Sequence, residues 1–111
     1  MANILNQETM DSLRELGDDF FLELIETFLD SSQTQMETLR KAIKEKSAPG
    51  IEAAAHSLKG SCYGQGAEEL GLLCKEMEAK GRENDMTDIA PLIQNIEASL
   101  DRTHEALKQL L

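Results

Sequence analysis

The chain has 111 residues, with 21 acidic and 11 basic side chains and a formal net charge of −10. That length allows one domain with one hydrophobic core and is too short for two, so residues 1–111 are expected to form a single domain. The acidity argues against nucleic-acid binding, which needs a basic face to neutralise phosphates, and against adsorption to an anionic membrane surface.

The composition predicts an all-α fold. Leucine, alanine, glutamate, lysine and glutamine are abundant, and all are good helix formers. The two prolines and the few β-branched runs argue against an all-β fold. No segment approaches the ~20 apolar residues of a membrane span, and no signal peptide is read at the N-terminus. A cytoplasmic protein is therefore expected.

The first two predicted helices differ in length. The first runs from about Gln7 to Leu16 and ends at Gly17. The second is capped by Asp18 or Asp19 and extends to about Lys46. Its apolar residues recur close to the helical period of 3.6 and are Phe21, Leu24, Ile25, Phe28, Met36, Leu39 and Ile43.

A third helix is predicted to follow a break at residues 47–50. Ser47 is its expected N-cap, and Pro49 lies in its first turn. The helix is expected to end around Gly64 or Gly66. Its inward stripe is expected to consist of Ile51, Ala54, Ala55, Leu58 and Cys62.

Two further helices complete the chain. The fourth begins near Ala67 and carries Leu70, Leu73, Cys74 and Met77, with Gly81 as its expected C-terminal stop. A polar loop spans residues 82–86, and Thr87 or Asp88 then caps the last helix. The apolar residues of this helix are Ile89, Leu92, Ile93, Ile96, Leu100, Leu107 and Leu110.

The helices predict the architecture. Four substantial helices joined by short loops favour antiparallel neighbours, which gives an up-and-down four-helix bundle. The short first helix would pack across one end or flank. The two cysteines, Cys62 and Cys74, fall on apolar stripes and are interpreted as small buried, reduced residues rather than a disulfide scaffold.

His56 is the candidate reactive residue. On a helical wheel it lies roughly 120° from the centre of the apolar stripe, so its imidazole is expected to face water. Gly60 follows one turn later, although glycine in a helix interior costs ~1 kcal/mol relative to alanine. Its missing side chain clears space beside the imidazole, Lys59 brings a cation that can balance a phosphoryl charge, and Tyr63 shares the face.

His104 serves as an internal comparison. It lies in the last helix without a nearby glycine or a basic residue three positions on, and we interpret it as a surface polar residue.

The chemistry of His56 is limited by what the sequence lacks. Neutral imidazole is a competent nucleophile toward activated phosphoryl groups. The chain has no P-loop, no glycine-rich nucleotide lid and no acidic metal box. A phosphoryl group on His56 must therefore be delivered, already activated, by another protein.

These residues resemble a known signature. The run His56-Ser57-Leu58-Lys59-Gly60-Ser61-Cys62, followed by Gly66-Ala67, Leu70 and Cys74, is similar to the H-x-L-K-G-S-S-x-x-x-G-A motif of histidine-containing phosphotransfer (HPt) domains. The resemblance extends over nearly the whole chain. It implies a four-helix bundle whose histidine accepts a phosphoryl group from a receiver-domain aspartate and passes it to another receiver.

The resemblance also implies roles for individual residues. His56 would be phosphorylated, Lys59 and Gly60 would be its supporting neighbours, and Ser61 would form a hydrogen bond near the phosphohistidine. The implied partners are response-regulator receiver domains and a hybrid sensor histidine kinase. The chain would be a monomeric covalent carrier rather than an enzyme, without a cofactor of its own, because Mg²⁺ belongs to the receiver.

Two positions depart from the family pattern. Cys62 stands where a second serine is common, and Glu78 stands where some members place a glutamine near the histidine. An acid there would repel phosphate unless it bonds the other imidazole nitrogen or points away. Glu78 is therefore left outside the predicted site.

A partner-docking patch is predicted around His56. Leu72 lies off the apolar stripe of the fourth helix, and Tyr63 lies on the histidine's own face. Met10 and Leu13 of the first helix would extend the patch.

Two alternatives compete with the carrier function. One is a non-catalytic helical interaction module, against which the exposed Gly60 argues. The other is a metal site of His56, Cys62, Cys74 and His104. Inward cysteines and an outward His56 do not fit tetrahedral zinc coordination.

Overall fold

The computed structural model describes residues 2–111. This part of the chain contains helices and no strand, which confirms the prediction of an all-α fold. The five helices are α1 (Gln7–Arg14), α2 (Asp18–Lys44), α3 (Ala48–Gln65), α4 (Glu68–Arg82) and α5 (Ile89–Lys108).

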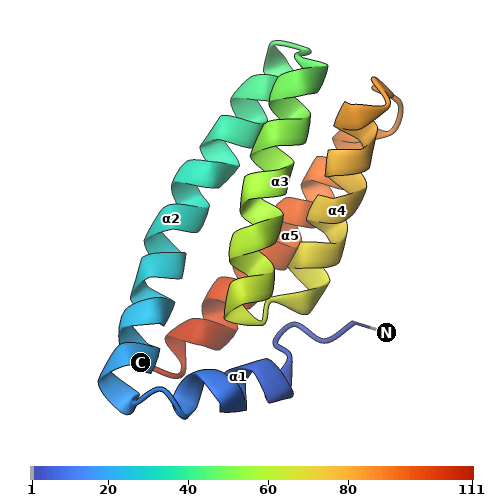
Figure 1. Cartoon of the computed structure of the whole chain (residues 1–111). Helices are drawn as coiled ribbons and strands as arrows, with labels where there is room; N and C mark the ends of the chain where they lie inside the picture. The colour runs from blue at the N-terminus through green and yellow to red at the C-terminus, as the bar shows by residue number, and fades with distance from the viewer. Residues whose placement is uncertain (1) are drawn as a thin grey trace.

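Four long helices lie alongside one another, and α1 lies across their lower end in Figure 1. Helix α3 packs most extensively against α4 and α2, and α5 packs against α4 and α2. The apolar stripes of these helices meet in one core. Its largest fully buried hydrophobic side chains are Ile25, Met36, Leu39, Ile51, Leu58, Leu70, Met77, Ile96 and Leu107. The core holds α3 between two neighbours and leaves its outer face free.

The ends of α3 follow the local sequence. Ser47 is the N-cap, as predicted, and its hydroxyl accepts a hydrogen bond from the Gly50 amide at 3.1 Å. Pro49 lies in the first turn, where its missing N–H costs nothing. The helix ends at Gln65, and its C-cap is Gly66, whose φ of 85° lies in the left-handed region that favours glycine.

The predicted cap of α2 is wrong, and this helix ends slightly earlier than expected. Helix α2 is capped by Gly17, and neither Asp18 nor Asp19 makes a capping hydrogen bond; both lie in the first turn, where the helix dipole favours acids. Helix α2 also ends at Lys44 rather than Lys46. Asp88 is the N-cap of α5, as predicted, but its backbone is left-handed and its side chain makes no capping hydrogen bond.

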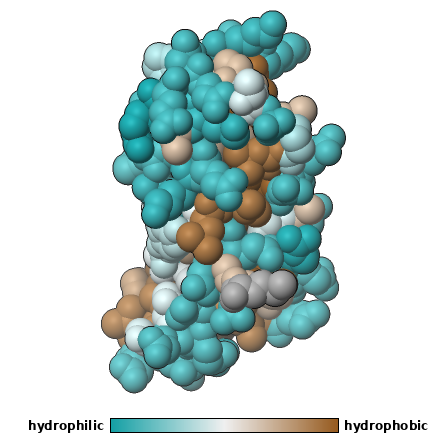
Figure 2. All heavy atoms as spheres, turned by 90° about the vertical axis from the view of Figure 1, so that its right-hand side faces the viewer, coloured by the Kyte–Doolittle hydropathy of each residue, from teal (hydrophilic) through white to brown (hydrophobic). Residues whose placement is uncertain are grey.

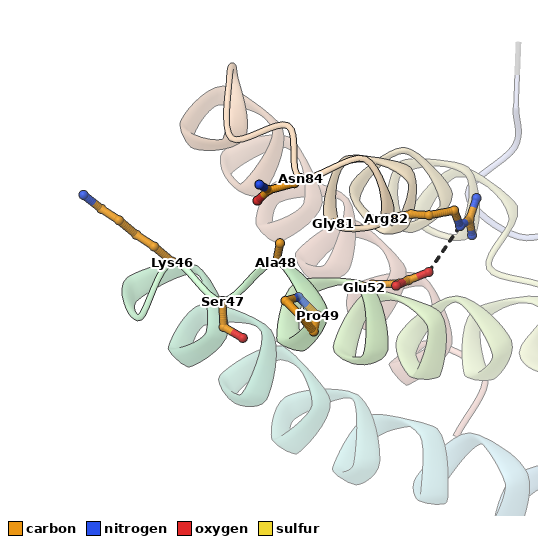
Figure 3. Close-up of a pocket in the computed structure, with 8 residues that line it drawn as sticks. All are labelled: Lys46, Ser47, Ala48, Pro49, Glu52, Gly81, Arg82 and Asn84. Carbon is orange, nitrogen blue, oxygen red and sulfur yellow. Dashed lines mark hydrogen bonds and ion pairs between the residues drawn. The ribbon is translucent and has the colours of Figure 1, made fainter.

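Gly81 does not stop α4, which continues to Arg82. A Cβ atom on Gly81 would lie 2.5 Å from the Glu52 backbone nitrogen and 2.9 Å from the Ala48 carbonyl oxygen, so the glycine allows α4 to approach α3 closely. Arg82 then crosses to Glu52, with its Nε 3.2 Å from Oε2 (Figure 3). The glycine therefore marks a helix contact rather than a helix end.

Most of the molecular surface is hydrophilic, but a band of hydrophobic side chains crosses the side shown in Figure 2. The large hydrophobic residues that stay exposed are Leu16, Phe20, Tyr63, Leu72 and Leu111. None of the helices within residues 2–111 has both the length and the apolar character needed to cross a membrane.

His104 is buried, which corrects its interpretation as a surface residue. Its Nε2 lies 2.7 Å from the Ser32 hydroxyl of α2, and its ring meets that of Phe28 edge-on. The helical wheel misses this burial because the hydroxyl of Ser32 gives the imidazole a partner inside the core. Burial, reinforced by the charge of Lys108, lowers the pKa of His104 below its usual 6.5.

Stability is expected to fall as the pH drops below about 6.5, because the unfolded chain then binds a proton at residue 104 that the folded chain does not. Urea unfolding at pH 7.5 and pH 5.5 measures this loss. The interval from pH 7.5 to pH 5.5 lies above the ordinary pKa range of carboxyl groups, so the Asp and Glu side chains contribute little to this change in stability. The loss should shrink in His104→Gln, and an unchanged loss in that variant would contradict the assignment.

Candidate functional site

His56 lies in the middle of α3 on the face that the core leaves free. Its side chain is 69% exposed, which confirms the predicted exposure of the imidazole. The neighbouring Ala55 and Leu58 are fully buried and hold this part of the helix in place. The imidazole is thus presented to solvent from a fixed backbone.

Glu78 of α4 reaches the imidazole from behind. Its side chain is only 6% exposed, and its Oε2 lies 2.6 Å from Nδ1 of His56. Its other oxygen, Oε1, accepts a hydrogen bond from Nζ of Lys59 at 2.6 Å. Arg82, one turn further along α4, brings an Nη2 atom within 3.4 Å of Oε2. Two cations and one imidazole therefore surround a single buried carboxylate.

These contacts keep Glu78 ionised. The hydrogen bond from Lys59 does most to lower the pKa of the carboxyl, and the hydrogen bond from His56 acts in the same direction. Burial opposes them but does not prevail. An ionised carboxylate only accepts hydrogen bonds, so the hydrogen of the short contact belongs to Nδ1 of His56.

The surface beside His56 is open at Gly60. A Cβ atom there would meet nothing within 4 Å, so the predicted clearing is confirmed. The Lys59 side chain is 24% exposed, and its ammonium group donates to Glu78. The surface is thus open at Gly60, while the Lys59 ammonium bonds the same carboxylate as the imidazole.

Ser61 is not brought to the imidazole. Its hydroxyl faces α2 and accepts a hydrogen bond from Nε2 of Gln35 at 3.0 Å, and the same amide also bonds Ser57. The cause is geometric, because residues five apart on a helix point about 140° away from each other. In this structure Ser61 ties α3 to α2.

The predicted docking residues fall into two groups. Leu72 is 43% exposed and Tyr63 is 41% exposed, and the Tyr63 ring packs over Gly71, so both offer surface on α3 and α4. Met10, in contrast, is 2% exposed, and its placement in the docking patch is wrong because its side chain belongs to the core. Leu13 is half-buried against that core.

Sequence reasoning left Glu78 out of the site. A helical wheel shows which face of α4 Glu78 occupies, but not which residue of α3 stands opposite, because that register is set by tertiary packing. One chemical condition could have placed Glu78 in the site: an acid beside the histidine is tolerated if it bonds the second imidazole nitrogen. The structure meets that condition.

The cysteines and His104 lie apart from this site. Interaction with the neighbouring Cys74 side chain, together with burial, raises the pKa of the Cys62 thiol, which makes it a poor metal ligand. Within residues 2–111, no three side chains of the metal-binding types gather into a group that could hold an ion.

Comparison with known proteins gives consistent matches. The family model for the Hpt domain matches residues 23–109. The phosphorelay protein LuxU of Vibrio vulnificus is 28% identical over 109 residues, which cover 97% of this chain and 92% of that protein. The crystal structure of histidine-containing phosphotransfer protein B from Pseudomonas aeruginosa superposes with a TM-score of 0.93 at 28% identity, covering 98% of this chain and 95% of that one.

A more distant structure shares the fold. Ypd1 of Saccharomyces cerevisiae, solved in complex with the receiver domain of its downstream response regulator Ssk1, gives a TM-score of 0.71 at 20% identity. The alignment covers 99% of this chain and 90% of that chain.

Proposed function

Because the chain belongs to the Hpt domain family, we propose that it carries a phosphoryl group on His56 between receiver-domain aspartates in a phosphorelay. The single observation that carries this proposal is the exposed His56 imidazole, held from behind by a buried carboxylate and flanked by open space at Gly60. In this proposal the four long helices form an antiparallel four-helix bundle, which presents the His56 nucleophile from the middle of α3.

The proposed reaction is a reversible in-line transfer. A lone pair on the exposed imidazole nitrogen of His56 forms a bond to phosphorus, while the bond between phosphorus and the receiver's aspartyl oxygen breaks. The bonding electrons stay on the aspartate, and the phosphorylated imidazole carries the positive charge. Attack by the carboxylate of a second receiver reverses the step and restores neutral His56.

Neighbouring residues support the transfer by charge and access. The Lys59 ammonium group bonds the same carboxylate as the imidazole, and from there it can turn toward a phosphoryl oxygen. Gly60 leaves the approach unobstructed. Ser61 accepts a hydrogen bond from Gln35 of α2, so it helps to hold α3 against α2 and does not contact the reacting atoms.

The carrier requires partners for the rest of the chemistry. The receivers supply the aspartate and the Mg²⁺ that neutralises the developing charge, and this chain needs no cofactor. A hybrid sensor histidine kinase is the proposed source of the phosphoryl group, since the chain has no nucleotide-binding motif. The protein is proposed to act as a cytoplasmic monomer.

Transfer of radiolabelled phosphate from a phosphorylated receiver domain tests the function. Label on this chain that is lost in acid and survives alkali identifies a phosphohistidine. If a broad panel of receivers leaves the folded protein unlabelled, the carrier function is wrong and a non-catalytic interaction module takes its place.

Leu72→Asp is expected to slow transfer about 10-fold in kcat/KM, because a charge would replace an exposed apolar side chain at the proposed docking surface. Stopped-flow or quench kinetics with one receiver measures the effect. Leu111→Asp is the matched control, since this leucine is also exposed but lies at the C-terminus, away from α4 (Figure 1). Equal kinetics for both variants would remove Leu72 from the docking surface.

A further inference from the structure

We propose that Tyr63 is the anchor residue of the receiver-docking surface and that Gly71 is the positioning residue that holds its ring. Tyr63 of α3 is 41% exposed, whereas Gly71 is buried in α4. The inference rests on the proposed carrier function and deepens it, because it identifies a contact that selects among receivers. It concerns the binding of the receiver and not the reacting atoms.

The Tyr63 ring packs into the place where any other residue at position 71 would carry its side chain. A Cβ atom on Gly71 would lie 2.7 Å from Cε1, 3.0 Å from Cδ1 and 3.1 Å from Cζ of the ring. All three atoms belong to one side of the same ring. The contact between the ring and α4 therefore depends on the absence of a side chain at this position.

The backbone does not require a glycine at position 71. Within residues 2–111, the glycines with a positive φ are Gly17 and Gly66, so Gly71 has backbone angles that any residue can adopt. Inside a helix, glycine is also less favourable than alanine. The Tyr63 ring, which a larger residue would displace, is the feature of the structure that explains this glycine.

A ring held in this way is suited to binding. Tyrosine offers a large contact area with few rotatable bonds, and a side chain that is already in place loses little entropy when a partner covers it. Burial raises the pKa of the Tyr63 phenol, although the charge of Lys59 acts in the opposite direction. The phenol is neutral at pH 7, so its burial by a partner desolvates no charge.

The position of Tyr63 identifies the partner as the receiver itself. Tyr63 follows His56 by seven residues, which places it on the same helix face within about 20° and about 10.5 Å further along the axis. A standard interface covers about 800 Å² on each partner, which is a patch about 30 Å across. A receiver that centres its aspartate on His56 therefore also covers Tyr63.

The surroundings of Tyr63 define the receiver surface that fits. Leu72, the residue after Gly71, is 43% exposed and adds a second apolar side chain. Lys59 and Glu68 lie close enough to shift the pKa of the phenol in opposite directions. An apolar centre with charged neighbours is the usual anatomy of an interface. The matching receiver surface is apolar and uncharged, about 10 Å from its aspartate.

Tyr63→Ala is the first test, by single-turnover transfer from a phosphorylated receiver. The receiver concentration that gives half the maximal rate should rise at least ~10-fold, with little change in the maximal rate, because the anchor acts on binding. Tyr63→Phe keeps the ring and should restore the wild-type value. Leu111→Ala is the matched control, because Leu111 is also an exposed hydrophobic residue but lies at the C-terminus.

Gly71→Ala tests the positioning role without removing the tyrosine. The half-saturating concentration should rise at least ~3-fold, within the range of coupling between residues in contact. The melting temperature should not fall, because the exposed ring can move outward and alanine favours the helix. In the Tyr63→Ala background, Gly71→Ala should have no further effect on transfer. An equal effect in both backgrounds would overturn the positioning role.

The outcomes separate this inference from the carrier function. Transfer from receivers with an unchanged half-saturating concentration in Tyr63→Ala would refute the anchor and leave the carrier function standing. If no receiver in a broad panel labels the folded wild type, the carrier function and the anchor both fail.

Discussion

His56→Gln is expected to abolish phosphoryl acceptance while leaving the fold intact. The imidazole is 69% exposed and fills no part of the core, so its replacement removes a nucleophile and little packing. The amide of glutamine can still donate to Glu78, which keeps the buried carboxylate partnered. Label from a phosphorylated receiver should fall to background, and the melting temperature should stay within about 4 °C of the wild type.

His104→Gln is the control for this experiment, because the chain has only two histidines. His104 is buried between α2 and α5 and bonds Ser32, so it cannot reach a receiver. This variant should be less stable than the wild type and still take up label. Label remaining on His56→Gln, or lost only from His104→Gln, would refute the assignment of His56.

Gly81→Ala is expected to lower the free energy of unfolding by about 3 kcal/mol, the upper range for overpacking a well-packed contact. The new Cβ would lie 2.5 Å from the Glu52 nitrogen and 2.9 Å from the Ala48 oxygen. Both atoms belong to the backbone of α3 and cannot rotate away. The helices would have to separate at the contact shown in Figure 3, and the higher helix propensity of alanine offsets only ~1 kcal/mol.

Gly60→Ala is the matched control, because Gly60 also lies inside a helix but has open space around it. Alanine there should stabilise the protein by up to ~1 kcal/mol, since nothing opposes the gain in helix propensity. Urea unfolding of both variants gives the comparison. If Gly81→Ala is as stable as Gly60→Ala, the close approach of α3 and α4 at Gly81 is not real.

The helices and the exposure of His56 could be predicted from the sequence because their signals are local. Apolar residues recurring every three or four positions mark the inward faces, and Ser47 with Pro49 marks the start of α3. The exposure of His56 follows from its angle to the same stripe. The motif shared with HPt domains adds the chemistry to these local signals.

What the sequence could not predict depends on contacts between helices. Gly81 was expected to end α4, because a glycine at a helix contact and a glycine at a helix end are indistinguishable in one sequence. His104 was placed at the surface because its burial needs Ser32, 72 residues away. Met10 was placed in the docking patch because the packing of α1 onto the core determines which of its faces is covered. The contact between Glu78 and His56 depends on the register of α3 against α4, which the sequence does not reveal.

The exposed position of His56, the proposed carrier residue, on the outer face of α3 has a consequence for signal flow. In the proposed relay a single imidazole both takes and gives the phosphoryl group, so the donor receiver and the acceptor receiver must occupy the same face in turn. Each therefore acts as a competitive inhibitor of the other's reaction. Throughput is greatest at a balanced ratio of the two and declines when either is in excess, so the relative abundance of the partners becomes a control on the pathway.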